Sequence, residues 1–545
     1  MIRAPAFDTL RAVLAGHLAR QPERTFLIAP ETGRILSYRE IDRQARLLAR
    51  YLRSRGLKRG DKVALYLHNG YQAALLFLSA MIGGYVVAPL NLLAQRSQLT
   101  YVLGHCDCRM LFTSREHEKS LGEALAGVKR GIEVIVIDPD AAGLFIEKEL
   151  PQTDFESLAP EDPALLMYTS GTTGKPKGVM HTVGNFDATK VAMEELCIMM
   201  HPKLFSYLPL SHIAERVGIE ICGIYRGAEF SFAESLETFP KNLAETQPNL
   251  FFAVPRIWAK FREKILEKIP QKKLSRLLSI PIVNSIVKKS IRKKLGLAET
   301  EHIFSGAAPI SVDLLKWFES IGITILQGIG MTEDCIYSHV NRIGNNKIGT
   351  VGIPFSGLKI KISSEGELRL KGPSNMKGYY KEPELTAEAF DEEGYLCTGD
   401  KGEIDPKQFL TIVGRLKDQF KTDKGKYVAP APIEMKLLAN EDIEQVCIVG
   451  MGIPQPIALT VLSAAGKAKS KEALIQSLSS SLVQVNAGLE SYEKLEKSVI
   501  MRGDWTIENG LMTPTMKVKR NEVEKIHVPK YPDWYHAKEG VVIWE

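Results

Sequence analysis

Cysteine pairing is the first feature that the sequence lacks. The seven cysteines of the 545-residue chain are an odd number, are scattered, and include no pair with C-x-x-C spacing. This pattern suits a reducing compartment, so we expect a cytoplasmic protein. Cys106 and Cys108 are separated by one residue, which is not the spacing of a zinc site, and we predict no metal there. The first eight residues have no charged segment followed by an apolar core, so we expect no secretory signal in them.

An uninterrupted apolar span long enough to cross a membrane is also missing. Residues 73–90 carry no charge, but Gly83 and Gly84 divide them. Residues 86–89 are typical of a strand that ends at a proline. We therefore predict a buried helix, a turn and a buried strand rather than a membrane span.

Positive charge is in excess in one segment only. The net charge is +6, and residues 259–295 contain twelve lysines and arginines against two glutamates, a local balance of +10. The rest of the chain therefore carries −4. Because the excess does not extend over the whole chain, we predict no nucleic-acid binding.

The sequence has no internal repeats and no low-complexity segment, and its first third alternates between helix and strand patterns. Residues 37–40 have the spacing of a capping box, and Ile41, Ala45, Leu48 and Leu52 follow at helical spacing up to Gly56. Residues 63–67 and 133–137 are short apolar segments typical of strands. This alternation predicts an α/β fold with mostly parallel sheets.

A second pattern begins near residue 357. Residues 358–362, 366–370, 394–396 and 409–413 resemble short strands between turns, which predicts a small β-rich subdomain at about 350–415. The chain becomes lysine-rich after residue 418. We expect residues 1–415 to form a large N-terminal domain of two mostly parallel α/β subdomains plus the β-rich one, and residues 416–545 to form a smaller, mobile α+β domain.

A glycine-rich stretch at residues 168–178 is the strongest functional signal. Three glycines, four hydroxyl residues and two lysines in eleven positions can cradle a polyanion, because backbone N–H groups, hydroxyls and ammonium groups all bind phosphate oxygens. The stretch is not a Walker loop, since Gly171 and Gly174 are separated by two residues and Pro176 follows Lys175. The alternative is a surface hairpin without a ligand.

This stretch resembles the phosphate-binding loop of the acyl-adenylate-forming enzymes, which include acyl-CoA synthetases, firefly-type luciferases and the adenylation domains of peptide synthetases. The other motifs of that family follow in order along nearly the whole chain. The resemblance implies ATP, Mg²⁺ and coenzyme A as ligands, with Thr172 near the metal. The implied phosphate-binding residues are Thr169, Ser170, Gly171, Thr172, Thr173, Gly174, Lys175 and Lys177.

Two further segments resemble the nucleotide site of that family. Residues 327–333 resemble its second nucleotide motif, in which Thr332 would bind the α-phosphate and Glu333 would help to hold Mg²⁺. Ile329 stands where the family usually has an aromatic ring that stacks on adenine, so we expect weaker ATP binding or a compensating ring elsewhere. The residues implied at the adenine are Gly306, Ala307, Ala308, Pro309, Gly328, Ile329 and Gly330.

The remaining motifs lie at the end of the expected N-terminal domain and in the expected mobile domain. Asp400 would bind the ribose hydroxyls, since a carboxylate accepts two hydrogen bonds from a diol, and Arg415 would contact the ribose and phosphate region. Lys417 resembles the hinge residue, and Lys421 and Gly425 resemble the face used in the second half-reaction. Lys517 resembles the catalytic lysine, which stabilises charge as a carboxylate attacks the α-phosphorus.

Residues 207–216 indicate the class of acid. They resemble a pattern of the long-chain fatty acyl-CoA synthetases, in which His212 would lie near the substrate carboxylate, and residues 252–258 fit the same branch. We expect a fatty acid to be converted to its CoA thioester. The alternatives are loading of a carrier protein, a ligase for aryl or other small acids, and a weakly active nucleotide- or lipid-binding homologue.

The basic segment adds a hypothesis about location. We expect Ile282, Val283, Ile286, Val287, Ile291 and Leu295 on one side of a helix, with Lys288, Lys289, Arg292 and Lys293 largely on another. A basic amphipathic helix suits an anionic membrane surface, so residues 260–295 predict peripheral contact with the inner face of a membrane. The alternative is a solvated helix that covers the core. Chain-length preference and oligomeric state stay open.

Overall fold

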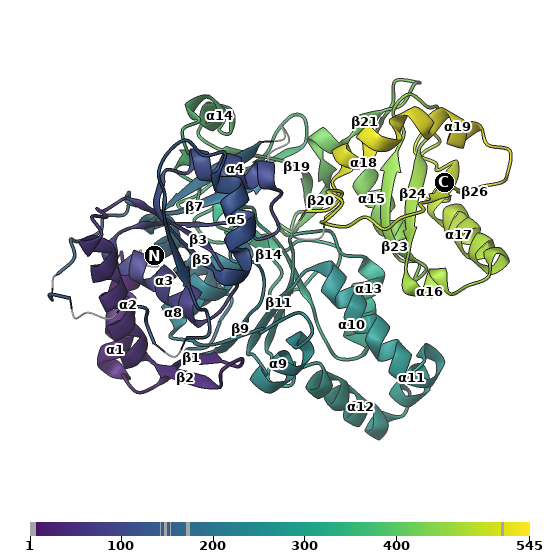
Figure 1. The fold of residues 1–545 in the computed structure, drawn as a ribbon. Coiled ribbons are helices and arrows are strands. Elements are labelled where there is room, and N and C mark those ends of the chain that lie inside the picture. Colours follow the sequence, from purple (N-terminus) through teal and green to yellow (C-terminus); the bar gives the residue numbers. More distant parts are fainter. Residues whose placement is uncertain (1–6, 142, 147–149, 153, 171–174, 514–516) are drawn as a thin grey trace.

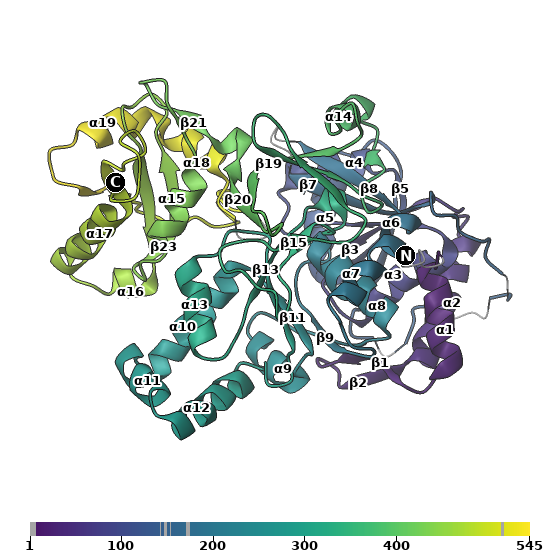
Figure 2. The ribbon, with the colours of Figure 1, turned by 180° about the vertical axis from the view of Figure 1, so that it is seen from behind.

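The computed structural model describes residues 7–141, 143–146, 150–152, 154–170, 175–513 and 517–545. Figures 1 and 2 show a large N-terminal body and a smaller C-terminal lobe beside it. The predicted α/β class is confirmed, with mostly parallel sheets in the large domain. In the described part of the chain, no helix has the length and apolar character needed to cross a bilayer.

One sheet of the N-terminal body has seven strands in the order β18-β8-β7-β4-β3-β5-β6. Its strands β7, β4, β3, β5 and β6 run parallel, and β8 and β18 are antiparallel additions at one edge. The strands are β3 (Lys62–Tyr66), β4 (Val86–Pro89), β5 (Cys108–Ser114), β6 (Glu133–Ile137), β7 (Pro163–Ser170), β8 (Pro176–Thr182) and β18 (Gly378–Tyr379).

The second sheet of this body has nine strands in the order β15-β14-β13-β12-β11-β9-β10-β1-β2. Six of them, β13, β12, β11, β9, β10 and β1, are parallel neighbours. The strands are β1 (Thr25–Ala29), β2 (Arg34–Ser37), β9 (Lys203–Ser206), β10 (Glu229–Phe232), β11 (Leu250–Ala253), β12 (His302–Ser305), β13 (Leu326–Ile329), β14 (His339–Val340) and β15 (Ile353–Pro354).

The predicted β-rich region contains a four-stranded antiparallel sheet. Its strands are β16 (Lys359–Ile362), β17 (Glu367–Lys371), β19 (Leu396–Ile404) and β20 (Leu410–Arg415). The short strand expected at residues 394–396 is wrong: Leu396 begins β19, which continues through Asp400 to Ile404. This longer strand pairs Asp400 with Arg415 of β20 in direct register.

The C-terminal lobe is built on a four-stranded sheet in the order β23-β24-β25-β26, beside a two-stranded hairpin. One face of the larger sheet packs on α15 and α17, and the other on α18 and α19, so successive residues such as Ile448 and Val449 enter different cores. The strands are β21 (Phe420–Lys421), β22 (Tyr427–Val428), β23 (Ile443–Val449), β24 (Ile457–Leu462), β25 (Lys497–Ile500) and β26 (Val542–Trp544).

Helices cover the sheets of both domains (Figure 1). In the N-terminal body they are α1 (Leu10–Arg20), α2 (Tyr38–Ser54), α3 (Tyr71–Gly83), α4 (Arg96–His105), α5 (Glu118–Leu125), α6 (Val183–Ala188), α7 (Lys190–Glu195), α8 (Cys222–Arg226), α9 (Phe239–Thr246), α10 (Pro255–Lys268), α11 (Gln271–Leu278), α12 (Pro281–Lys294), α13 (Val312–Ser320) and α14 (Pro383–Glu388). In the C-terminal lobe they are α15 (Pro430–Leu437), α16 (Ala464–Lys467), α17 (Lys471–Asn486), α18 (Arg520–His527) and α19 (Tyr531–His536).

Local predictions in the first third are confirmed. Ser37 and Glu40 form the capping box of α2, whose apolar stripe is buried in the main core. The uncharged residues 73–90 form the buried end of α3, a left-handed turn at Gly84 and the buried strand β4. These features depend on neighbours close in the sequence, which is why periodicity and capping signals identify them.

The prediction of a single apolar side on α12 is wrong. Ile282 and Ile286 are 78% and 63% exposed, whereas Ile291 is buried. Arg292, expected on the basic side, donates its guanidinium hydrogens to the carbonyls of Leu297, Gly322 and Thr300. Because α12 packs on the core through its C-terminal half, the isoleucines of its N-terminal half are exposed to solvent.

Candidate functional site

A cavity of about 2380 Å³ lies between the N-terminal body and the C-terminal lobe, and residues of both line it. Most of the predicted site residues meet at this cavity, although they come from distant parts of the sequence. Those that line it are Thr169, Lys177, His212, Gly306, Ala307, Ala308, Pro309, Gly328, Ile329, Gly330, Thr332, Glu333, Asp400, Arg415, Lys417 and Lys517.

Other predicted residues lie elsewhere or cannot be placed. Lys421 and Gly425 are neighbours at the β21–β22 turn and do not line the cavity in this conformation. The ammonium of Lys175 lies 5.9 Å from the centre of the Tyr101 ring. The side chain of Ser170 and the whole of Gly171, Thr172, Thr173 and Gly174 lie outside the described residues.

The glycine-rich stretch connects β7 and β8, which pair as an antiparallel hairpin. The register places Thr169 opposite Lys177, one pair before Ser170 and Pro176, the last described pair before the tip. The ammonium of Lys177 lies 4.9 Å above the Tyr379 ring, at the wall of the cavity. The hairpin therefore presents a hydroxyl and a cation to the cavity from the base of the predicted phosphate loop.

Thr332 and Glu333 form a tight turn that Gly330 permits. A Cβ at Gly330 would lie 2.4 Å from the Cα of Ile336, so the turn can approach the chain only if this residue has no side chain. Ile336 itself has a φ of +53°, which is strained for a β-branched residue. Such strain is common where surrounding contacts hold a functional turn in place.

Two buried side chains hold this turn in position. His181 of β8 donates from Nε2 to the carbonyl of Thr332 at 2.6 Å, and burial lowers the pKa of His181 to about 4, so the ring is neutral. The Tyr379 hydroxyl donates to Glu333 at 3.0 Å. Burial raises the pKa of Glu333, while the nearby cations Arg415 and Lys177 oppose this shift.

A magnesium ion fits the chemistry of these residues. Glu333 offers a carboxylate at the cavity wall, and Mg²⁺ in proteins is usually held by one or two carboxylates together with substrate phosphates and water. A buried carboxylate whose charged form is disfavoured gains from a cation beside it. The second predicted metal residue, Thr172, lies outside the described part of the chain.

Asp400 and Arg415 form a cross-strand ion pair at the rim of the cavity. Nε of Arg415 donates to Oδ1 of Asp400 at 2.9 Å, and the carboxylate raises the pKa of Arg415. One donor therefore occupies one oxygen of Asp400, which leaves further lone pairs for a diol. The two residues that the sequence placed near a ribose thus stand side by side.

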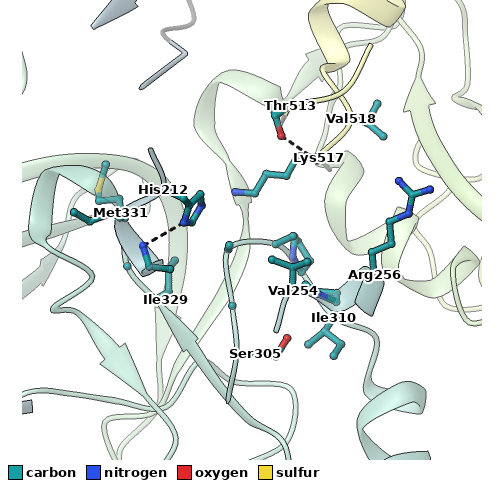
Figure 3. Close-up of a pocket in the computed structure, with 18 of the residues that line it drawn as sticks. His212, Val254, Arg256, Ser305, Ile310, Ile329, Met331, Thr513, Lys517 and Val518 are labelled. Carbon is teal, nitrogen blue, oxygen red and sulfur yellow. Dashed lines mark hydrogen bonds between the residues drawn. The ribbon is translucent and has the colours of Figure 1, made fainter. Parts of the chain in front are cut away.

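Lys517 extends from the C-terminal lobe into the cavity toward His212, as Figure 3 shows. Its backbone N–H donates to Oγ1 of Thr513 at 3.0 Å. The side chain stays accessible to the water of the cavity, yet the surrounding protein and the cation of Arg415 lower the pKa of Lys517 to about 8. Asp400 and Asp418 act in the opposite direction.

His212 is held as a neutral hydrogen-bond donor. Its Nδ1 accepts the backbone N–H of Ala214 at 3.2 Å, so the proton of the neutral ring is on Nε2. Burial, and next the charge of Lys517, lower the pKa of His212 to about 4. Over the physiological range this ring can donate to an anionic oxygen but does not carry a positive charge.

Sequence reasoning missed the side chains that support His212. Oε2 of Glu215 accepts the backbone N–H of Leu208 at 3.0 Å, which ties the start of the His212 loop to the π-helix Ala214–Ile221. Arg216 is fully buried, pairs with Glu220, and lies 4.3 Å above the Phe77 ring. Glu215 and Arg216 belonged to the pattern at residues 207–216, but only their burial reveals a supporting role.

The sequence is similar to known enzymes over most of its length. The AMP-binding enzyme family matches residues 14–380, and its C-terminal domain matches residues 417–539. A sulfoacetate–CoA ligase of Cupriavidus necator is 33% identical, over 83% of this chain and 86% of that protein. The long-chain-fatty-acid–CoA ligase FadD15 of Mycobacterium bovis is 27% identical, over 89% of each chain.

Solved structures have the same fold. The adenylation domain of a carboxylate reductase from Mycobacterium chelonae matches with a TM-score of 0.81 at 23% identity, over 98% of this chain and 92% of that one. An anthranilate CoA ligase in complex with anthranoyl-AMP matches with a TM-score of 0.76 at 19% identity, over 96% and 98%. On the matched residues and the identity of these relatives, the chain belongs to the AMP-binding enzyme family.

Proposed function

We propose that the protein is an AMP-forming acid–CoA ligase whose acid is a fatty acid. The observation that carries the proposal is the meeting of Lys517, Glu333 and the Asp400–Arg415 pair at one cavity that also contains His212. A cation, a metal-binding carboxylate and a diol acceptor are the groups that an adenylation reaction needs around a nucleotide. The relatives that are named as acid–CoA ligases support the same activity.

In the first half-reaction a carboxylate oxygen attacks the α-phosphorus of ATP, and pyrophosphate leaves. Lys517 stabilises the charge that develops on the phosphoryl oxygens, and Thr332 hydrogen-bonds to the α-phosphate. The Nε2–H of His212 orients the carboxylate. Thr169 and Lys177 contact the departing phosphates. Glu333 and Thr172 would hold Mg²⁺, which would neutralise phosphate charge.

In the second half-reaction the thiol of CoA attacks the acyl carbon, loses its proton, and AMP leaves. Residues 416–545 rotate as a domain about Lys417, which lies in the 3₁₀ turn Leu416–Asp418 directly after β20. This rotation withdraws Lys517 and brings Lys421 and Gly425 to the cavity. Their present position away from the cavity fits the conformation used for the first step.

Apolar side chains in the cavity lining support a fatty acid over a small charged one. The lining of the cavity includes the apolar side chains Met193, Leu196, Val217, Leu250 and Phe252. A small neighbouring cavity shares Met193 and Leu250 with it and is also bordered by Ile198 and Leu204. An alkyl chain gains free energy from such surroundings, whereas a second anionic group would lose its hydration there.

Arg226 provides the observation that favours a second candidate. This cation borders the small cavity, so an acid with a second anionic group at its far end could pair with it.

Pyrophosphate release should be measured with C6–C24 fatty acids and with sulfoacetate, each with and without CoA. We expect the highest kcat/KM with a fatty acid, together with free acyl-CoA as product. A preference for sulfoacetate would refute the fatty-acid assignment, and product formed only on a carrier protein would refute the CoA assignment.

Membrane contact through residues 260–295 is part of the proposal and accompanies a cytoplasmic location. Helices α11 and α12 lie at the lower edge of the molecule in Figures 1 and 2, and residues 269–298 contain no acidic residue. Exposed Ile282 and Ile286 are followed at helical spacing by exposed Lys289 and Lys293. An apolar pair beside a basic pair suits an anionic lipid surface.

Flotation with vesicles that contain anionic lipid tests this contact. The double variant Lys289→Glu, Lys293→Glu should lose binding, and Arg292 is left unchanged because it holds α12 to the core. The control Lys494→Glu, Lys538→Glu changes the net charge equally at exposed lysines of the C-terminal lobe and should still bind. Equal flotation of both variants would reject the membrane face.

A further inference from the structure

An ion pair joins the two domains close to Lys517. Nη2 of Arg256, at the start of α10, lies 2.5 Å from Oε1 of Glu444 in β23, and the two side chains are 30% and 32% exposed. We propose that Arg256 is a positioning residue: it holds the C-terminal lobe in the orientation that places Lys517 in the cavity. This inference rests on the proposed two-step reaction.

Arg256 also contacts the segment that carries Lys517. Its Nη1 lies 3.8 Å from Sδ of Met512. Met512 pairs with Val518 as an isolated β-bridge, so the two residues close the base of the loop that holds Lys517. Figure 3 shows the Arg256 side chain among the residues that line the same cavity. One guanidinium of the N-terminal body thus reaches both the sheet of the lobe and the base of its catalytic loop.

The lobe supports this contact from behind. Gln445, the residue after Glu444, donates from Nε2 to Sδ of Met512 at 3.1 Å and to the carbonyl of Trp505 at 3.0 Å. Gln445 is buried, so strand β23 and the base of the loop move as one unit. A displacement of Glu444 relative to Arg256 therefore also displaces Lys517.

The exposure of the pair fits a contact that forms and breaks in each cycle. Partly exposed ion pairs are weak because water competes for both charges. The pair therefore favours the adenylation orientation without preventing the rotation about Lys417. For the second half-reaction Glu444 must leave Arg256, so the same pair opposes that step.

Separate assays of the two half-reactions test the proposal. In Arg256→Ala, ATP–pyrophosphate exchange should fall about two- to fivefold, as expected for loss of one partly exposed pair. Formation of acyl-CoA from supplied acyl-AMP and CoA should be unchanged or faster. The charge swap Arg256→Glu, Glu444→Arg should restore the exchange. Lys264→Ala, at an exposed position of α10, should leave both reactions at the wild-type rate.

A distance measurement between the two domains reports this contact independently of catalytic activity. Spin labels at the exposed positions of Leu236→Cys and Val483→Cys, with exposed Cys197→Ser, report the separation of the two domains. Arg256→Ala should broaden the distance distribution, and the charge swap should narrow it again. Unchanged distributions, or equal losses in both half-reactions, would overturn the role of Arg256. Absence of exchange in the wild type with a broadened distribution in the variant would instead refute the proposed reaction.

A second inference comes from a group of side chains away from the cavity. His68, Glu116 and His117 each offer one ligand atom, and these atoms all lie within 4.8 Å of one another. Oε1 of Glu116 is 3.6 Å from Nε2 of His68 and 3.3 Å from Nε2 of His117. Tetrahedral zinc bonds of about 2.0–2.1 Å place ligand atoms at about 3.3–3.4 Å from each other. We infer that these residues bind a divalent transition metal of the zinc class.

The fold places the three ligands after the carboxyl ends of two neighbouring strands. His68 follows β3 and the 3₁₀ turn Arg115–His117 follows β5, and these strands are parallel neighbours. The His117 ring packs 5.2 Å from the Tyr66 ring, which limits its rotation. Its Nε2 is buried and makes no hydrogen bond to any described residue. A metal would satisfy that nitrogen and would link the two loops.

Calorimetric titration of the whole protein with zinc chloride tests this site. The wild type should bind one more Zn²⁺ than either His68→Ala or His117→Ala, and bound Zn²⁺ should raise its melting temperature. His536→Ala, an exposed histidine of the C-terminal lobe, should behave like the wild type. His68 is mostly exposed, so its variant should fold even if that of His117 does not. Equal zinc stoichiometry in the wild type and His68→Ala would overturn the inference.

Discussion

The chemistry of Lys517 depends strongly on its surroundings. Residues around the cavity lower its pKa to about 8, far below that of a solvated lysine. A lowered pKa means that the ammonium form is present below about pH 8 and is lost as the pH rises through that value. The group proposed to stabilise the transition state is therefore charged at neutral pH and titrates just above it.

The pH dependence of the first half-reaction should report this titration. We expect kcat/KM for ATP–pyrophosphate exchange to fall above about pH 8, because kcat/KM follows the ionisation of the free enzyme. The arginine of Lys517→Arg keeps its charge throughout this range, so the lower kcat/KM of that variant should not fall at alkaline pH. The same alkaline fall of kcat/KM in the arginine variant would assign the titration to another group.

Ile329 is the second residue with a specific expectation. It lines the cavity, is half-buried against the main core, and stands where a ring would stack on adenine in the resembling enzymes. Ile329→Tyr should lower the KM for ATP about two- to tenfold, since aromatic contacts add about 0.5–1.5 kcal/mol. Steady-state kinetics with Ile329→Leu as an apolar control checks this. An unchanged KM would indicate that another ring already contacts the adenine.

At the scale of the element, the turn that carries Thr332 and Glu333 depends on Gly330. The Cβ of Gly330→Ala would meet the backbone of Ile336, and the turn would have to move. A displacement of about 1 Å can cost roughly 100-fold in rate, so we expect a loss of that order in pyrophosphate release. The measurement should be made on protein whose circular dichroism matches the wild type.

Gly104→Ala is the matched control for that variant. Gly104 lies in α4, and no atom stands within 4 Å of an added Cβ. This exchange should leave activity unchanged and stabilise the fold by about 0.5–1 kcal/mol, because alanine favours a helix more than glycine does. Equal activity losses in both variants would show that close packing at Gly330 is not the cause.

At the scale of the whole molecule, the proposed cycle requires two orientations of the C-terminal domain. Proline fixes φ near −65°, which suits the 3₁₀ turn of this conformation but restricts a rotation at residue 417. Lys417→Pro should keep ATP–pyrophosphate exchange within about twofold of the wild type and lose most thioester formation from acyl-AMP and CoA. Lys417→Ala should retain both. Full thioester formation in the proline variant would exclude residue 417 as the hinge.

The sequence by itself determined the features that depend on near neighbours or on short motifs. Capping and periodicity identified α2, α3 and β4, and the order of motifs led to the family. It also brought Thr332, Glu333, Asp400, Arg415 and Lys517 into one hypothesis, and all five line one cavity. Their roles stay proposals, as does the domain division at residues 415 and 416.

Only the tertiary structure decided which distant residues touch. No local sequence pattern encodes the contact of Tyr379 with Glu333 or of Arg256 with Glu444, because these partners are far apart in the chain. The contact of Glu215 with the His212 loop depends on burial by other elements. The structure also turned Ile282 and Ile286 outward, since the C-terminal half of α12 packs on the core through Ile291 and Arg292. Packing and domain orientation arise from the sum of many contacts, whereas a motif records only those between near neighbours.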